Sequence, residues 1–234
     1  MPALRSDIDP DGLLEYSVVY TDRSLNHMSA AFQNVMRSLS AELKGVYKAE
    51  AVALVPGGGT YAMEAVARQI ATDKKVLVVR NGWFSFRWTQ ILETGDIADE
   101  TVVMKARKAA NATDAPFSPA PMDEVVARIA AEKPDVVFAP HVETSSGMIL
   151  PDAYLKKLSA AAHDVGAVFV LDCIASGCIW VDMKETGVDF LISAPQKGWS
   201  ASPCAGIVMM SERGREKAKA SKSTSFACDL GKWL

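Results

Sequence analysis

The stretch Val52-Ala53-Leu54-Val55-Pro56-Gly57-Gly58-Gly59-Thr60 joins a short apolar run to a loop of three glycines. After the loop, Met63, Val66 and Ile70 are spaced by three and four residues, which is the period of a helix that packs on one face. The run before the loop is as long as a strand and has no polar alternation, as expected of a strand buried on both faces. Residues 52–70 therefore predict a strand, a tight glycine loop and a helix.

The same alternation of strands and helices continues along the chain. Further strands are expected at residues 76–80, 101–103, 136–140, 168–172, 190–193 and 205–210. Helical stripes lie between these runs, and a helix over residues 28–46 precedes the first strand. Strands joined by crossovers of helix length form parallel sheets that are covered on both faces. The sequence thus predicts an α/β fold, with a mostly parallel mixed sheet flanked by helices.

Composition and charge exclude several classes of protein. The chain has 234 residues, of which 49% are hydrophobic and 23% are charged, so a globular fold is expected rather than a disordered or fibrous chain. The net charge of −3 offers no positive field for a nucleic-acid backbone. No apolar run reaches the ~18 residues of a membrane-spanning helix. We therefore expect no nucleic-acid partner and no membrane association.

The cysteines and the N-terminus indicate the compartment. The spacing of Cys173, Cys178, Cys204 and Cys228 does not match the ligand pairs of a zinc site, so free thiols and no metal are expected. The N-terminus lacks the apolar core of a signal peptide. Both features favour a cytoplasmic protein.

Polar residues concentrate in the loops that directly follow the predicted strands. In parallel sheets, ligands bind beyond the carboxyl ends of the strands. The loop of residues 57–60 can bring backbone N–H groups close to a phosphate, although a tight turn with Thr60 as a helix N-cap explains it equally well. Neither a Gly-x-Gly-x-x-Gly nor a Gly-Lys-Ser/Thr pattern is present, so a dinucleotide site or a P-loop is a weak interpretation.

Two charged residues near the ends of later strands suggest the chemistry. Asp172 ends the apolar run 168–171, where an unpaired carboxylate is costly, so we expect it to have a cationic partner. Lys197 is flanked by small and aromatic residues, which suits a partly desolvated amine that acts as a nucleophile. A capping aspartate and an exposed loop lysine are the ordinary alternatives. Together with an aromatic residue and a phosphate loop, these residues are the parts needed to bind pyridoxal 5'-phosphate.

Five motifs, in this order along the chain, resemble those of the class V aminotransferases, which are fold-type I pyridoxal-phosphate enzymes. The motifs are PGGGTYAME at 56–64, NGWFSFR at 81–87, HVETSSG at 141–147, LDCIAS at 171–176 and SAPQKG at 193–198. The resemblance covers about residues 57–210 and is strongest to the alanine–glyoxylate and serine–pyruvate aminotransferases. It implies that the predicted sheet is the large domain of this fold.

The resemblance also implies a role for individual residues. Lys197 would form the Schiff base with the cofactor and move protons, and Asp172 would bind the pyridine nitrogen. Phe84 and Ile174 would pack on opposite faces of the ring, and Thr144 would donate to its phenolic oxygen. The phosphate would be held by Gly58, Gly59, Thr60 and Gln196. No arginine of the chain is assigned to bind the substrate carboxylate. Arg87 is expected to form a structural or interface ion pair.

The resemblance further implies an organisation and a reaction. Residues 1–45 would form an N-terminal segment and helix, 46–215 the cofactor-binding large domain, and 216–234 the start of a connection to a small C-terminal domain that is missing here. The expected function is amino-group transfer between a small amino acid and a 2-oxo acid by a homodimer. Two alternatives stay open, namely a pyridoxal-phosphate lyase of the cysteine desulfurase or kynureninase type, and a catalytically incomplete fragment.

Overall fold

The computed structural model describes residues 29–234. Contacts divide the chain into two units, Met1–Glu42 and Leu43–Leu234. Helix α1 (Ala30–Tyr47) begins in the first unit and ends in the second, which confirms the described part of the helix predicted over residues 28–46. Residues 1–28, most of the predicted N-terminal segment, lie outside the described residues.

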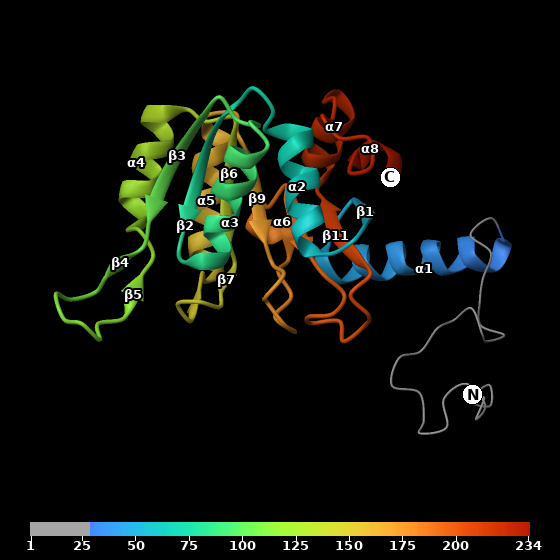
Figure 1. Ribbon diagram of the computed structural model, residues 1–234, viewed down its shortest axis with the longest axis horizontal. Coiled ribbons are helices and arrows are strands. Elements are labelled where there is room, and N and C mark those ends of the chain that lie inside the picture. The colour runs from blue at the N-terminus through green and yellow to red at the C-terminus, as the bar shows by residue number, and fades with distance from the viewer. Residues whose placement is uncertain (1–28) are drawn as a thin grey trace, which may run out of the picture. The chain divides into compact units, whose positions relative to one another are not determined.

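A seven-stranded sheet forms the centre of the second unit. Its strands are β1 (Ala51–Pro56), β2 (Lys75–Arg80), β3 (Glu100–Lys105), β6 (Val136–Pro140), β9 (Val168–Asp172), β10 (Phe190–Ser193) and β11 (Ala205–Met210). Their order is β1-β11-β10-β9-β6-β2-β3, and β11 runs antiparallel to both of its neighbours. The other pairs are parallel, so that β2, β3, β6 and β9 point toward one edge (Figure 1). Each strand contains a predicted run, which confirms the mostly parallel mixed sheet.

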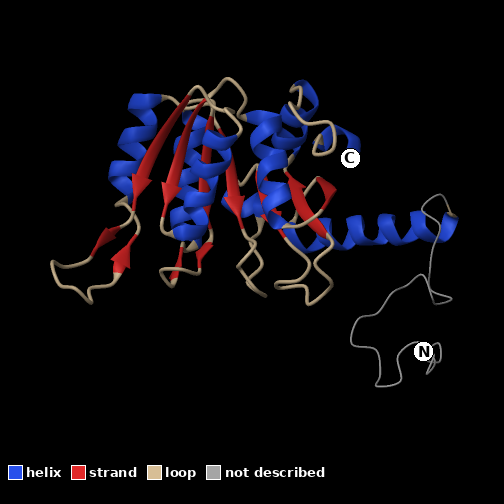
Figure 2. Ribbon diagram, viewed as in Figure 1, coloured by secondary structure: helices blue, strands red, loops and turns tan. Residues whose placement is uncertain are grey.

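Helices cover both faces of this sheet (Figure 2). One face carries α2 (Gly59–Ile70), α3 (Trp83–Thr94), α7 (Glu212–Ala220) and α8 (Leu230–Trp233). The other face carries α4 (Met122–Glu132), α5 (Asp152–Asp164) and α6 (Met183–Thr186). Alternate residues of each strand enter alternate clusters, as Val78 and Val79 of β2 do. The α/β fold with helices on both faces is therefore as predicted.

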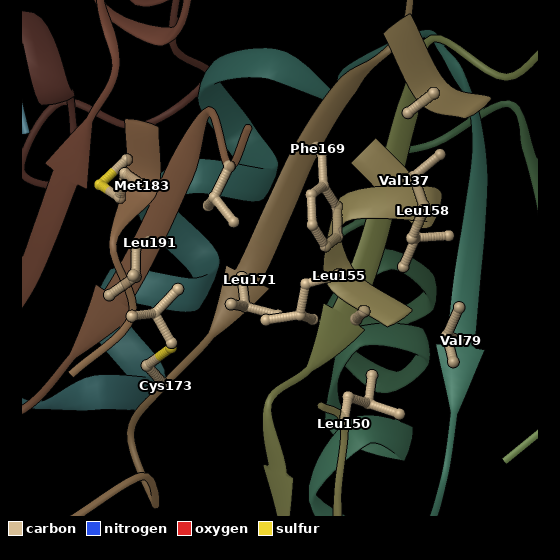
Figure 3. Close-up of a cluster of buried hydrophobic side chains, with 14 of the residues drawn as sticks. Val79, Val137, Leu150, Leu155, Leu158, Phe169, Leu171, Cys173, Met183 and Leu191 are labelled. Atoms are coloured by element: carbon tan, nitrogen blue, oxygen red, sulfur yellow. The ribbon is translucent and has the colours of Figure 1, made fainter. Parts of the chain in front are cut away.

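Strand β9 is buried over its whole length, which fixes the position of its last residue. Phe169 and Leu171 pack with Leu155 and Leu158 of α5 on one face of the sheet (Figure 3). The alternate residues of β9 pack against the opposite cluster. Any movement of β9 would open a void in one of the two clusters. The strand therefore holds Asp172 firmly at the carboxyl edge of the sheet.

The C-terminal segment is attached to α2 through one buried amide. Gln69 Nε2 donates to the carbonyl oxygens of Ala218 and Ser221 at 3.0 and 3.1 Å, and Gln69 Oε1 accepts from the backbone N–H of Leu230 at 3.1 Å. Leu230 is fully buried in the cluster beneath α2. Residues 218–230 thus pack against the same unit as the sheet.

Four short strands were not predicted. β4 (Arg107–Lys108) and β5 (Phe117–Ser118) form a hairpin, and β7 (Val142–Glu143) and β8 (Met148–Ile149) form another. Two-residue ladders leave no periodicity in a sequence, which is why they were missed. Of the helices that the structure describes, none has both the length and the apolar character needed to cross a membrane.

Candidate active site

A cavity of about 340 Å³ lies at the carboxyl edge of the sheet. Its lining comprises Gly59, Thr60, Phe84, Arg87, Val142, Thr144, Asp172, Ile174, Ala175, Gln196 and Lys197. Every predicted site residue except Gly58 is in this set, and Gly58 directly precedes Gly59. The topology therefore brings together loops from five separate strand ends, as the parallel sheet predicted.

The glycine loop leaves the N-terminus of α2 open. Gly58 is the N-cap residue, no side chain caps the helix, and a Cβ built on Gly58 would meet nothing within 4 Å. A Cβ on Gly59 would lie 2.5 Å from Ile174 Cδ1, so a larger residue at this position would require the Ile174 side chain to shift. Thr60 is a residue of the helix rather than its N-cap, so the N-cap role considered for Thr60 was wrong. The uncapped backbone N–H groups at this end can donate hydrogen bonds to an anion.

A buried carboxylate, Glu143, fixes the wall that carries Phe84. Glu143 is fully buried and accepts the backbone N–H of Phe84 at 3.1 Å and that of Ser85 at 2.8 Å. It also accepts the hydroxyl groups of Ser85 and Ser145, each at 2.7 Å. Burial opposes ionisation of Glu143, but these hydrogen bonds outweigh it and hold its pKa below the ordinary value. Glu143 thereby caps α3 and ties it to the turn that carries Thr144.

Sequence reasoning did not assign this role to Glu143. The residue was visible as an acid three positions after the predicted strand 136–140, shortly before Ser145 and Ser146. Its partner, the N-terminus of α3, lies about sixty residues earlier in the chain, and only the pairing of neighbouring strand ends brings the two together.

Asp172 presents a buried carboxylate to the cavity. Its Oδ1 atom accepts the backbone N–H of Ile174 at 2.9 Å. Burial raises the pKa of Asp172 to about 6, although the Ile174 N–H and the positive charge of Arg87 act in the opposite direction. Among the residues that the structure describes, no cationic side chain lies within the 4.0 Å of an ion pair. The expected cationic partner is therefore not supplied by the described part of this chain.

Lys197 lies in the turn that follows β10. Its side chain lines the cavity but is exposed, unlike the partly desolvated amine that the neighbouring residues suggested. The turn packs directly against residues 177–180. Gly198 lies so close to Gly177 that a Cβ on Gly198 would be only 2.0 Å from the Gly177 carbonyl oxygen. Trp199 packs on Trp180 with 4.7 Å between ring centroids. These contacts set where the lysine enters the cavity.

Arg87 is a cavity residue that the sequence did not identify. Its Nη1 atom donates to Thr60 Oγ1 at 3.3 Å, and its Cζ atom lies 5.3 Å from the centroid of the Phe84 ring. Among residues 29–234 of one chain Arg87 forms no ion pair, so the expected structural or interface ion pair stays a prediction. His141 lies outside the lining, where it is buried and bonded through Nδ1 to Ser176 Oγ at 2.7 Å.

Similar proteins are found among both curated sequences and solved structures. The 2-aminoethylphosphonate–pyruvate transaminase of Burkholderia mallei is 30% identical over 213 residues, which are 89% of this chain and 54% of that protein. The small subunit of a soluble hydrogenase from Synechococcus sp. is 26% identical over 212 residues, 89% of this chain and 53% of that protein. The crystal structure of an alanine–glyoxylate aminotransferase from Nostoc sp. superposes with a TM-score of 0.74 at 25% identity, over 88% of this chain and 53% of that one.

The chain spans about half the length of the curated relatives that it matches. The sequence model named "Aminotransferase class-V" matches residues 13–229, which include the whole sheet and every residue of the cavity. That match covers most of the chain and agrees with the motifs at the strand ends. The protein therefore belongs to the class V aminotransferases, a family of pyridoxal-phosphate-dependent enzymes.

Proposed function

We propose that the protein is a pyridoxal-phosphate-dependent aminotransferase that moves an amino group between a small amino acid and a 2-oxo acid. The observation that carries the proposal is the buried Asp172 carboxylate, which faces the cavity without an ion-pair partner among the described residues. A buried carboxylate of this kind is costly unless a positive group is brought to it. A protonated pyridine nitrogen is such a group, and Lys197 lines the same cavity.

The other walls of the cavity also fit this cofactor. The uncapped start of α2 at Gly58, Gly59 and Thr60 suits a phosphate, and Gln196 would add a polar contact. Phe84 offers an aromatic face to a ring, and Ile174 would pack against the opposite face.

Pyridoxal phosphate supplies an aldehyde that condenses with amines and a ring that draws electrons from the substrate α-carbon. The residues of this chain would bind it and handle the protons. Lys197 Nζ would bind the aldehyde carbon and later carry the proton that leaves the substrate α-carbon. Asp172 would keep the proton on the pyridine nitrogen, and the Thr144 hydroxyl would donate to the phenolic oxygen.

We further propose that the active protein is a cytoplasmic homodimer whose cavity lies near the subunit interface. Tyr61 and Trp83, beside the cavity residues Thr60 and Phe84, are 58% and 60% exposed, and exposed aromatic surface is typical of interfaces. Residues 46–215 remain the proposed cofactor-binding domain.

Borohydride reduction of the protein mixed with an equimolar amount of pyridoxal phosphate tests the proposal. We expect one covalent adduct, which peptide mass spectrometry places on Lys197 and which Lys197→Ala abolishes. Lys184→Ala, which removes an exposed lysine on α6, is the matched control and should leave the adduct intact. A stoichiometric adduct that persists in Lys197→Ala would contradict the assignment.

A further inference from the structure

Arg87 contacts two different walls of the cavity. It projects from the second turn of α3, where its guanidinium donates to the Thr60 hydroxyl of α2 at 3.3 Å. The same guanidinium packs over the ring of Phe84, three residues earlier on α3. Thr60 and Phe84 are the residues proposed to hold the phosphate and to stack on the ring. The Arg87 side chain therefore connects the start of α2, at Thr60, with the part of α3 that carries Phe84.

Arg87 is also the cation that acts on Asp172 from the α3 side. Its positive charge lowers the pKa of Asp172, whereas the buried Glu143 of β7 raises it. The remaining charged group of the cavity lining is Lys197, from the turn after β10. Because Lys197 would be bound to the cofactor aldehyde, Arg87 is the lining cation that remains to balance the two carboxylates.

We propose that Arg87 is a positioning residue, which braces Thr60 against Phe84 and sets the electrostatic environment of Asp172. This inference rests on the proposed function, because it gives Arg87 a role toward a bound pyridoxal phosphate. A guanidinium suits the role because it is planar, permanently charged and able to stack on a ring while it donates hydrogen bonds. A lysine supplies the positive charge, but it lacks the planar group that stacks on a ring and the paired N–H donors of a guanidinium.

Arg80 provides a matched control. Its Cζ atom lies 4.9 Å from the centroid of the Phe86 ring, so it makes the same kind of cation–π contact two residues away from Phe84. Arg80 does not line the cavity. Loss of Arg80 thus removes a comparable contact and one positive charge without touching the proposed site.

The test measures binding of pyridoxal phosphate by equilibrium dialysis, together with the pH midpoint of the bound cofactor's absorption, in wild type, Arg87→Met, Arg87→Lys and Arg80→Met. We expect Arg87→Met to weaken binding about tenfold, which is the loss of one cation–π contact and one hydrogen bond, and to shift the midpoint. In Arg87→Lys, the pH midpoint should lie close to the wild-type value, whereas the affinity for pyridoxal phosphate should recover only in part. Arg80→Met should match wild type in both.

Equal affinity and an equal midpoint in wild type and Arg87→Met would overturn the inference. If Arg87→Met does not fold, Arg87→Lys decides, because wild-type affinity in that variant would equally contradict a role for the planar guanidinium. Failure of the proposed function looks different, since wild type itself would then bind no cofactor at Lys197. In that case the unfolding of the ligand-free proteins still tests the effect of Arg87 on Asp172. Arg87→Met must then change the pH dependence of unfolding that arises from Asp172, whereas Arg80→Met must not.

Discussion

Glu143 accepts both the backbone N–H and the hydroxyl of Ser85, at 2.8 and 2.7 Å, although the two residues are 58 positions apart in the chain. The carboxylate thereby takes the place of an N-cap residue at α3, whose own N-cap is Gly82. A Cβ at Gly82 would lie 2.3 Å from Ser145 Oγ, so the approach of the two segments depends on that glycine. The helix that carries Phe84 and Arg87 is thus anchored from a neighbouring strand end.

We predict that Glu143→Gln lowers the free energy of unfolding at neutral pH by about 1–3 kcal/mol, because an amide group cannot accept all of the donors that converge on the carboxylate. The difference should shrink on acidification. The folded-state pKa of Glu143 is depressed, so its contribution is present above the unfolded pKa and is lost as the pH falls through the folded value. Urea unfolding at several pH values measures both effects.

The matched control is Glu93→Gln, which alters an exposed glutamate in the last turns of the same helix. It should change stability by less than about 0.5 kcal/mol. Equal losses in the two variants, or a loss in Glu143→Gln that does not depend on pH, would contradict the capping role.

Gly198→Ala tests whether the lysine turn depends on its contact with residues 177–180. The added Cβ would lie 2.0 Å from the Gly177 carbonyl oxygen, a backbone atom that cannot move aside alone. We expect a loss of about 1–3 kcal/mol in stability and weaker binding of pyridoxal phosphate, because Lys197 moves with the turn. Thermal unfolding and equilibrium dialysis measure these two quantities.

Gly45→Ala is the control for this substitution. A Cβ at Gly45, inside α1, meets nothing within 4 Å, so alanine should raise stability by up to about 1 kcal/mol and leave cofactor binding unchanged. Unaltered binding in Gly198→Ala would indicate that the position of the turn does not matter for the cofactor.

The sequence predicted the long strands and the edge at which the cavity lies, but not how its walls are joined. Runs such as residues 168–172 are apolar on both faces, and the residue after each run marks the carboxyl edge. The roles of Glu143 and Arg87 depend on contacts between segments far apart in the chain, and a glutamate or arginine in a loop has many possible partners. The exposure of Lys197 likewise depends on how its turn packs, which its neighbours in sequence do not determine.

Cys173 should be inert although it directly follows Asp172. Its thiol is buried in the cluster shared with α5 and α6, and burial raises its pKa far above the ordinary range (Figure 3). Because the thiolate is the reactive form, we predict that iodoacetamide at neutral pH labels the exposed Cys178 and Cys204 but not Cys173. Peptide mass spectrometry before and after addition of urea identifies the labelled sites.

This prediction also bears on the lyase alternative, since a cysteine desulfurase requires a nucleophilic cysteine. Labelling of Cys173 in urea but not in the native protein would exclude it as that nucleophile. Rapid labelling of Cys173 in the native protein would contradict its burial and reopen the alternative.

Asp172 is predicted to lower the stability of the ligand-free protein in a pH-dependent way. Its pKa is raised from 3.8 to about 6 by burial, so the folded chain binds more protons than the unfolded chain between these values. The free energy of unfolding therefore falls as the pH rises from about 4 to about 6. A shift of two units corresponds to about 3 kcal/mol, an order-of-magnitude figure, and the full cost is present above the folded-state pKa.

Asp172→Asn removes this charge but keeps an oxygen that can accept the Ile174 N–H. In the absence of cofactor, we expect the variant to equal wild type near pH 4 and to exceed its stability above pH 6, by up to about 3 kcal/mol. Asp114→Asn, at an exposed position between β4 and β5, should follow wild type at every pH. Urea unfolding of the three proteins from pH 4 to pH 8 provides the comparison.

Pyridoxal phosphate should reverse the order of stability. A protonated pyridine nitrogen would supply the missing cation to Asp172, so the cofactor is expected to stabilise wild type more than Asp172→Asn. A carboxylate that destabilises the empty site and stabilises the occupied one is selected for binding rather than for folding. Parallel pH profiles of wild type and Asp172→Asn would show that Asp172 is not desolvated as described, and equal stabilisation by the cofactor would show that it does not face the pyridine nitrogen.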